Sequence, residues 1–123
     1  MFGLFKSDQL YIKVSSNYVE IIDVDKNKKV NGKSIEPFSS ERLLIAEFSV
    51  AEDFMNDLIN KLKRNNRSNA ILFHPIDFVE GRISEVETRI FLEISARLKG
   101  RKVKIWVGQE LTNKRVIEEL NKK

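Results

Sequence analysis

His74 is the only histidine of the chain, and it follows an apolar run at the point where a buried strand is expected to end. Strand ends of α/β sheets often carry active groups, so His74 is the first residue to consider for chemistry. The chain has no cysteine and no second histidine that could complete a ligand set with it. We therefore expect His74 to be a hydrogen-bonded structural residue, and we expect no metal site.

Two aspartates, Asp23 and Asp25, stand two positions apart beside an expected turn. Strand alternation places both on one face, where carboxylates near a turn usually meet water. The sequence contains no glycine-rich phosphate loop, no H-E-x-x-H pair and no G-x-S-x-G nucleophile turn. The acidic pair is therefore interpreted as solvated.

Basic residues gather in two stretches, 61–67 and 97–104, and Trp106 follows the second. Such stretches can contact the phosphates of nucleic acids or of anionic lipids. The expected sheet lacks the paired exposed aromatic residues of an RNA-binding platform, which argues against nucleic acid as a partner.

The N-terminal segment is unusually apolar for a chain end. Residues 1–8 include Phe2, Leu4 and Phe5, followed by Lys6, and we expect the segment to be flexible or to touch a membrane. Two interpretations stay open: the aromatic rings dock on the domain, or they enter a membrane interface as a weak anchor. In the second case the nearby anionic headgroups would be met by a basic loop containing Lys63, Arg64 and Arg67.

The elements that position these residues are organised around the stretch 69–104. The apolar run Ala70–Phe73 ends near Pro75 and is typical of a strand buried on both faces. A helix is expected next, ended by Gly100, and the alternation over Val103–Val107 predicts a second strand, so the unit predicts a right-handed parallel crossover. The apolar stripe of the helix is Ile83, Val86, Ile90, Phe91, Ile94 and Leu98.

Three strands precede this unit. Apolar residues alternate or cluster over 10–14 and 18–24, on either side of the turn-prone Ser15-Ser16-Asn17, and residues 30–35 form a weaker third strand. These segments predict a strand meander.

Two further helices complete the expected elements. Ser49 and Glu52 match the S-x-x-E capping box, which predicts a helix that begins there and continues to Leu62. An apolar stripe over 111–120 predicts a terminal helix. The order β-β-β-α-β-α-β-α predicts an α/β domain over residues 1–123, with a mixed sheet of about five strands and helices packed on it.

The composition is that of one soluble globular domain. The chain has 123 residues, of which 41% are hydrophobic and 33% are charged, with a formal net charge of +4. No apolar run approaches the ~20 residues that span a bilayer. The N-terminus lacks the features of a secretory signal, so a cytoplasmic location is expected, at most peripheral to the inner face of the membrane.

Several short motifs stand at the starts and ends of these elements. They are Leu-Ile-Ala-Glu-Phe-Ser-Val-Ala-Glu at 44–52, the run 70–75 with its final proline, Val-Glu-Thr-Arg at 86–89, Gly-Arg-Lys-Val at 100–103, and Met-Phe-Gly and Asp-Gln-Leu at 1–3 and 8–10. Together they resemble the first large subdomain of the bacterial actin family MreB. The resemblance implies a ribonuclease-H-like sheet, as in each half of the actin-like ATPases.

The resemblance also implies where a nucleotide would bind. In this family the first hairpin carries a D-x-G-T loop, in which the aspartate organises magnesium-bound water and the glycine lets backbone amides approach the phosphates. Here the hairpin carries Lys13 in place of the carboxylate and Ser15 in place of the glycine, followed by Ser16. The second phosphate loop and the adenosine pocket have no counterpart in this sequence. We therefore expect no ATPase activity, no catalytic residue and no cofactor.

Glu87 corresponds to the water-positioning glutamate of the family. Without the rest of that site it is expected to be a solvated helix residue, paired with Arg89 or Arg82. The loop before this helix is longer than the family pattern around 78–82. Phe78 and Val79, with Glu87 and Arg89, are therefore candidate interaction residues.

These inferences predict a non-catalytic protein-interaction module that resembles MreB. The expected partner is a bacterial actin homologue or a second copy of the chain, within the cell-shape or division machinery. The alternative is a peripheral membrane-binding protein that uses the N-terminal segment and the basic loop.

Overall fold

The computed structural model describes residues 8–62, 68–77 and 83–122. The elements are β1 (Asp8–Ser15), β2 (Tyr18–Asp23), β3 (Lys28–Lys33), α1 (Phe48–Asn60), β4 (Asn69–Pro75), α2 (Glu85–Arg97), β5 (Gly100–Ile105) and α3 (Asn113–Asn121). Their order confirms the expected sequence of strands and helices. Because β1 begins at Asp8, which is buried, the expected flexible segment overlaps the first strand by one residue.

The five strands form one mixed sheet in the order β3-β2-β1-β4-β5. β1 pairs antiparallel with β2, and β2 pairs antiparallel with β3. β4 pairs in parallel with both β1 and β5, so the crossover through α2 is parallel as predicted. All seven residues of β4 are buried, which confirms that the unalternating apolar run forms a strand buried on both faces.

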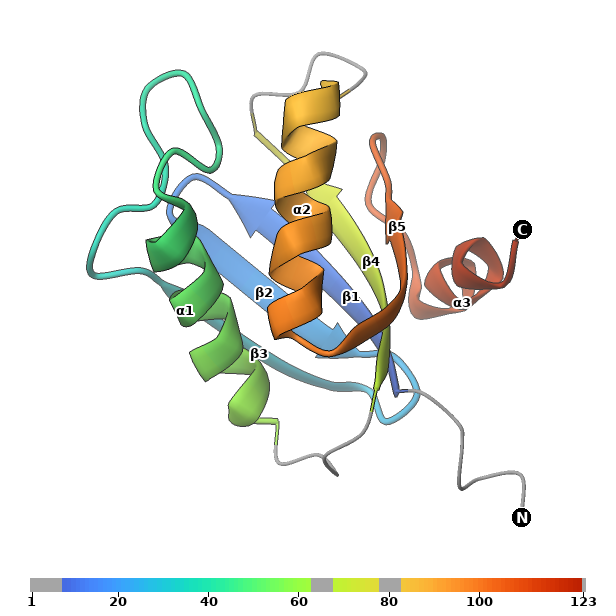
Figure 1. Ribbon diagram of the computed structural model, residues 1–123. Helices are drawn as coiled ribbons and strands as arrows, with labels where there is room; N and C mark the ends of the chain where they lie inside the picture. Colours follow the sequence, from blue (N-terminus) through green and yellow to red (C-terminus); the bar gives the residue numbers. More distant parts are fainter. Residues whose placement is uncertain (1–7, 63–67, 78–82, 123) are drawn as a thin grey trace.

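Helices cover both faces of the sheet. Leu10 and Ile12 of β1 belong to the larger core, which packs against α1 and α2, whereas Tyr11 between them belongs to the smaller core with Val116 and Leu120 of α3. Figure 1 shows α1 and α2 side by side over one face of the sheet, with α3 set apart from them near β5. The period of two along β1 therefore builds two cores from one strand.

The expected capping box at the start of α1 is wrong. The N-cap is Glu47, which makes no side-chain cap hydrogen bond, and Ser49 lies inside the first turn. The helix starts earlier because the amides of Ala46 and Glu47 both donate to the carbonyl of Phe38, at 2.7 and 3.0 Å, and fix the entry of the chain. Glu52 is instead paired with Arg97 of α2 at 3.1 Å.

The capping box that does form lies at α2. Ser84 is the N-cap and accepts a hydrogen bond from the Glu87 amide, while the Glu87 carboxylate accepts one from the Ser84 amide. The same S-x-x-E spacing is present in the sequence at 84–87, so this helix start is predictable from the sequence. The reciprocal pair fixes Glu87 at the first turn of α2.

The end of α2 also differs from the expectation. The left-handed residue is Lys99, at φ 60°, whereas Gly100 already belongs to β5. A Cβ on Gly100 would stand 2.9 Å from both the Cβ and the carbonyl oxygen of Ser95. Glycine is therefore required at position 100 for the close approach of β5 to α2, and not for the helix stop.

Val86 is the one member of the predicted apolar stripe of α2 that lies outside the core. Its side chain is 69% exposed, while Phe91, Ile94 and Leu98 are buried. Position 86 lies in the first turn of α2, where it lines a small cavity together with the segment 42–45. In the described part of the chain, no helix has the length and apolar content needed to cross a bilayer.

Candidate functional site

The turn between β1 and β2, where the resemblance places a phosphate loop, is occupied by contacts within the chain. The Ser16 amide donates to a carboxylate oxygen of Asp77 at 2.8 Å, and the Asn17 amide donates to the Ser39 hydroxyl at 3.0 Å. The Asn17 side chain in turn accepts hydrogen bonds from the amides of Phe38 and Ser39, at 2.9 and 2.8 Å. The amides of Ser16 and Asn17 in this turn are thus already bonded to protein groups.

Asn17 can hold this position because its backbone lies in the left-handed region, at φ 56°. Asparagine tolerates that conformation better than most residues, and its short side chain then reaches the backbone nearby. Its carbonyl also accepts from the Ser34 amide at 2.8 Å. The turn therefore clamps the segment 34–39 to the sheet and leads the chain toward α1.

Lys13 lies between two acidic side chains, at the position where the resemblance implies a phosphate-loop carboxylate. Its ammonium is 2.8 Å from the Glu20 carboxylate and also forms an ion pair with Glu110. Burial alone would lower the pKa of Lys13, but the hydrogen bonds to Glu110 and Glu20 outweigh it and raise the pKa. Lys13 in turn lowers the pKa of the Glu110 carboxyl. The cation is therefore internally neutralised.

His74 lies beside Lys13 in the register of β1 and β4 and is fully hydrogen-bonded. The Tyr11 hydroxyl and His74 Nδ1 are 2.6 Å apart, and His74 Nε2 is 2.9 Å from the Gly108 carbonyl. The Leu111 amide donates to the Tyr11 hydroxyl at 3.1 Å. Since a carbonyl can only accept, Nε2 carries the proton and Nδ1 accepts from Tyr11. The expectation that His74 is hydrogen-bonded is confirmed, and the network holds the segment 108–111 against the sheet.

We expect this network to make stability depend on pH. Burial, the largest influence, lowers the pKa of His74 below its ordinary value of about 6.5. The unfolded chain therefore binds a proton at His74 more readily than the folded chain. The contribution of His74 to stability is full above pH ~6.5 and is lost as the pH falls below this value. Urea midpoints measured across this range check the prediction.

The matched control for this pH dependence is His74→Gln, which removes the only histidine. The charged neighbours of His74 are Lys13 and Glu110. The Lys13 pKa is raised and the Glu110 pKa is lowered, so both groups titrate outside this window. The variant should lose the slope below pH ~6.5. An unchanged slope in the variant would contradict the assignment to His74.

The two aspartates near the second turn do not share one environment, contrary to the expectation. Asp23 is only 1% exposed, and its Oδ1 accepts from the amides of Asp25 and Lys26 at 3.2 Å. Its Oδ2 is buried without a partner within the described residues. Asp25 is exposed and bonds the side chain and amide of Gln9. The prediction that Asp23 is a solvated carboxylate is wrong, because its side chain folds back over the turn that it forms.

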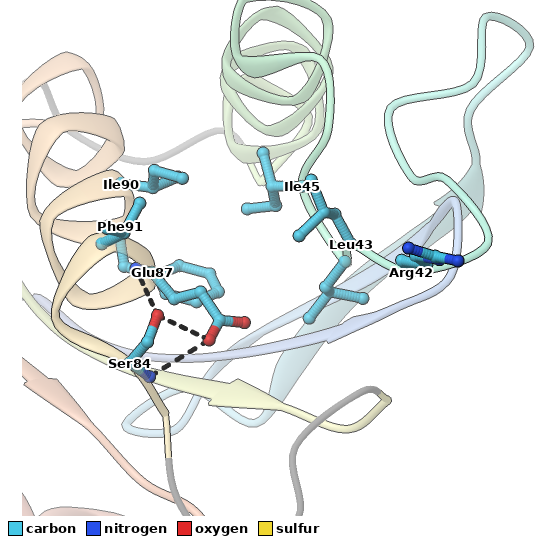
Figure 2. Close-up of a pocket in the computed structure, with 9 residues that line it drawn as sticks. Arg42, Leu43, Ile45, Ser84, Glu87, Ile90 and Phe91 are labelled. Carbon is cyan, nitrogen blue, oxygen red and sulfur yellow. Dashed lines mark hydrogen bonds between the residues drawn. The ribbon is translucent and has the colours of Figure 1, made fainter.

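A cleft lies between α2 and the segment 42–45. It encloses about 260 Å³ and has a largely apolar lining. Its lining residues are Arg42, Leu43, Leu44, Ile45, Ser84, Val86, Glu87, Ile90 and Phe91. Figure 2 shows the Glu87 side chain extending from α2 toward Leu43, with the capping hydrogen bonds to Ser84 beside it. Sequence reasoning singled out Glu87 here but missed the segment 42–45, which only the fold brings against α2.

The expected pairing of Glu87 with Arg89 does not form within the described residues, and the alternative partner, Arg82, lies outside them. The described hydrogen bonds of Glu87 all join Ser84, through Oε1 or the Glu87 amide, and no ion pair with Arg89 is present in the described part of the chain. Arg89 is exposed. Glu87 is therefore half-buried. Its hydrogen bonds cap α2, and part of its side chain remains accessible at the surface.

Several predicted site residues lie outside the described residues. These are the interaction residues Phe78 and Val79, the N-terminal Phe2, Leu4 and Phe5, and the loop residues Lys63, Arg64 and Arg67. Trp106, considered for base stacking, is described: its ring packs on the smaller core and its N–H donates to the Gln109 carbonyl at 2.8 Å. The Trp106 ring is therefore half-buried.

Across the described residues, no group of three or more histidine, aspartate or glutamate residues is arranged to hold a metal ion.

Comparison with known proteins gives one informative match. No family model matches the chain, and no solved structure matches it. The uncharacterized protein YjaA of Escherichia coli (strain K12) is 33% identical over 95 residues, which cover 71% of this chain and 73% of that protein.

Proposed function

This chain belongs to the same family as YjaA of Escherichia coli, and we propose that it is a non-catalytic protein-interaction module built on a ribonuclease-H-like fold. The name of the relative assigns no activity, so the proposal depends on the geometry of this chain. Its partner is a bacterial actin homologue or a second copy, as the resemblance to MreB implies, and its setting is the cell-shape or division machinery.

The sheet supports the fold assignment. β1 lies between an antiparallel meander on one side and two parallel strands on the other. The element order is the one that each half of the actin-like ATPases uses. Such folds place their chemistry at the ends of the strands, which here is the turn after β1 and the end of β4.

The single observation that carries the proposal is the Asp77 carboxylate on the Ser16 amide, at 2.8 Å. In an actin-like ATPase, a phosphate would approach amides of this turn. Here a phosphate would meet a negative charge of the chain itself, and two like charges about 4 Å apart repel by about 1 to 4 kcal/mol near a protein surface. Lys13, held by Glu20 and Glu110, is not available to offset this repulsion.

The cleft between α2 and 42–45 supports the second half of the proposal. Leu43 and Val86 on its rim are 52% and 69% exposed, although both are apolar. Exposed apolar side chains beside a concave surface are typical of sites that bind another protein. The proposed role is therefore contact and not turnover.

A capture experiment tests this function. The immobilised chain should retain a purified MreB-type actin across physiological salt, and Val86→Asp should abolish retention because a charge would enter the apolar contact. Leu92→Asp is the matched control, because Leu92 is a half-exposed residue of the same helix that does not line the cleft. Absence of retention by the wild-type chain at every salt concentration would exclude the actin partner.

A further inference from the structure

The cleft combines an exposed apolar side chain on its rim with a cavity beside it. Val86 stands on the rim with most of its side chain exposed, while the buried residues Phe91 and Ile45 form the floor. The cavity of about 260 Å³ is smaller than the ~300 to 1,000 Å³ of pockets that hold drug-sized ligands. It is large enough to accept an aliphatic side chain such as that of Val86 from another molecule.

Two opposite charges lie on the two sides of the cleft. Glu87 lies on the α2 side and Arg42 on the side of the segment 42–45, with Leu43 between them (Figure 2). Arg42 is exposed, and no ion pair to it is present among the described residues. The hydrogen bonds of the Glu87 carboxylate use Oε1, so Oε2 is left for a cation.

Twofold rotation makes such a surface complementary to itself. In a symmetric dimer each contact occurs twice, and a feature on one side of the axis meets the feature on the other side. Arg42 of one copy would then face Glu87 of the other, while each Val86 would enter the opposite cleft. A small ligand would use the cavity but would leave these two charges without a role.

We propose that the cleft between α2 and residues 42–45 binds a second copy of this chain in a twofold dimer. This inference rests on the proposed interaction function and names the occupant of the same site. The cleft has nine lining residues, against about 20 to 30 residues on each side of a standard interface. The dimer is therefore weak and reversible, with a dissociation constant in the micromolar range.

Sedimentation equilibrium of the full chain tests the proposal. The wild-type chain should fit a monomer–dimer equilibrium, and Val86→Asp should raise the dissociation constant by at least about tenfold. Leu92→Asp, with a comparable charge on the same helix outside the cleft, should leave it unchanged. A wild-type chain that stays monomeric at roughly millimolar concentration, or equal effects of the two substitutions, would overturn the dimer.

The charge pairing has its own variants. Arg42→Glu should weaken the dimer, and so should Glu87→Gln, which keeps the capping box because glutamine can accept the same hydrogen bonds. Unchanged affinity in both variants would overturn the twofold arrangement. A monomeric chain that still retains the actin in the capture experiment would refute the dimer alone, whereas a dimer that retains no actin would exclude only the actin partner.

Discussion

Phe91→Ala is expected to lower the free energy of unfolding by about 3 to 5 kcal/mol, the range for truncating a buried phenylalanine. The Phe91 ring is buried on the sheet, with its centroid 4.9 Å from that of Phe73 in β4. It joins α2 to β4 and lines the cleft. Urea unfolding followed by circular dichroism and by the fluorescence of Trp106, the only tryptophan, measures the change.

The neighbouring residue supplies the control for Phe91. Leu92 is 48% exposed, so Leu92→Ala removes fewer contacts with the core. We expect the free energy of unfolding to fall by less than about 1 kcal/mol. Equal losses in the two variants would show that α2 does not pack on the sheet through Phe91. A loss confined to Phe91 supports the placement of the cleft.

Tyr11→Phe is the second large effect, expected to cost roughly 2 to 4 kcal/mol. The substitution keeps the ring but removes the hydroxyl that serves both His74 and Leu111. Each buried polar group left without a partner costs about 1 to 3 kcal/mol. Because burial also raises the pKa of Tyr11, the hydroxyl stays protonated and remains a donor to His74 at neutral pH. Chemical denaturation at pH ~7.5 measures the loss.

Tyr18→Phe is the matched change for Tyr11. Tyr18 begins β2 on the exposed side of the same hairpin, and we expect its loss to stay within about 0.5 kcal/mol. If Tyr11→Phe were as mild as Tyr18→Phe, the network from Leu111 through Tyr11 to His74 would not stabilise the fold. The segment 108–111 would then be held by other contacts.

Elements with a strong local pattern were predictable from the sequence. The unalternating apolar run of β4 predicts a strand buried on both faces, and the structure confirms it. The strand predicted over 10–14 is present within β1, and its consecutive residues Leu10, Tyr11 and Ile12 are all buried. Two identical S-x-x-E motifs, at 49–52 and 84–87, could not be ranked in the same way. The motif at 49–52 does not cap α1, because the Phe38 carbonyl accepts hydrogen bonds from the chain just before the helix and the helix begins earlier. That contact joins Phe38 to a segment outside the motif, so the motif alone does not reveal it.

The sites were less predictable because they depend on contacts between distant segments. Asp77 carried no motif, yet it reaches Ser16 across sixty-one positions. Asp23 was misjudged because a turn aspartate can fold its carboxylate over its own backbone and become buried. Val86 fitted the helical stripe, yet its side chain is 69% exposed. Periodicity gives the face of a helix, and packing decides which part of that face is covered.

Calorimetric titration of the purified chain with ATP and magnesium tests the central claim most directly. If Asp77 and Ser39 hold the donors of the β1–β2 turn, no saturable heat should appear at millimolar nucleotide. Micromolar binding accompanied by phosphate release that Glu87→Gln abolishes would contradict the claim, because the turn would then be gripping a nucleotide for catalysis.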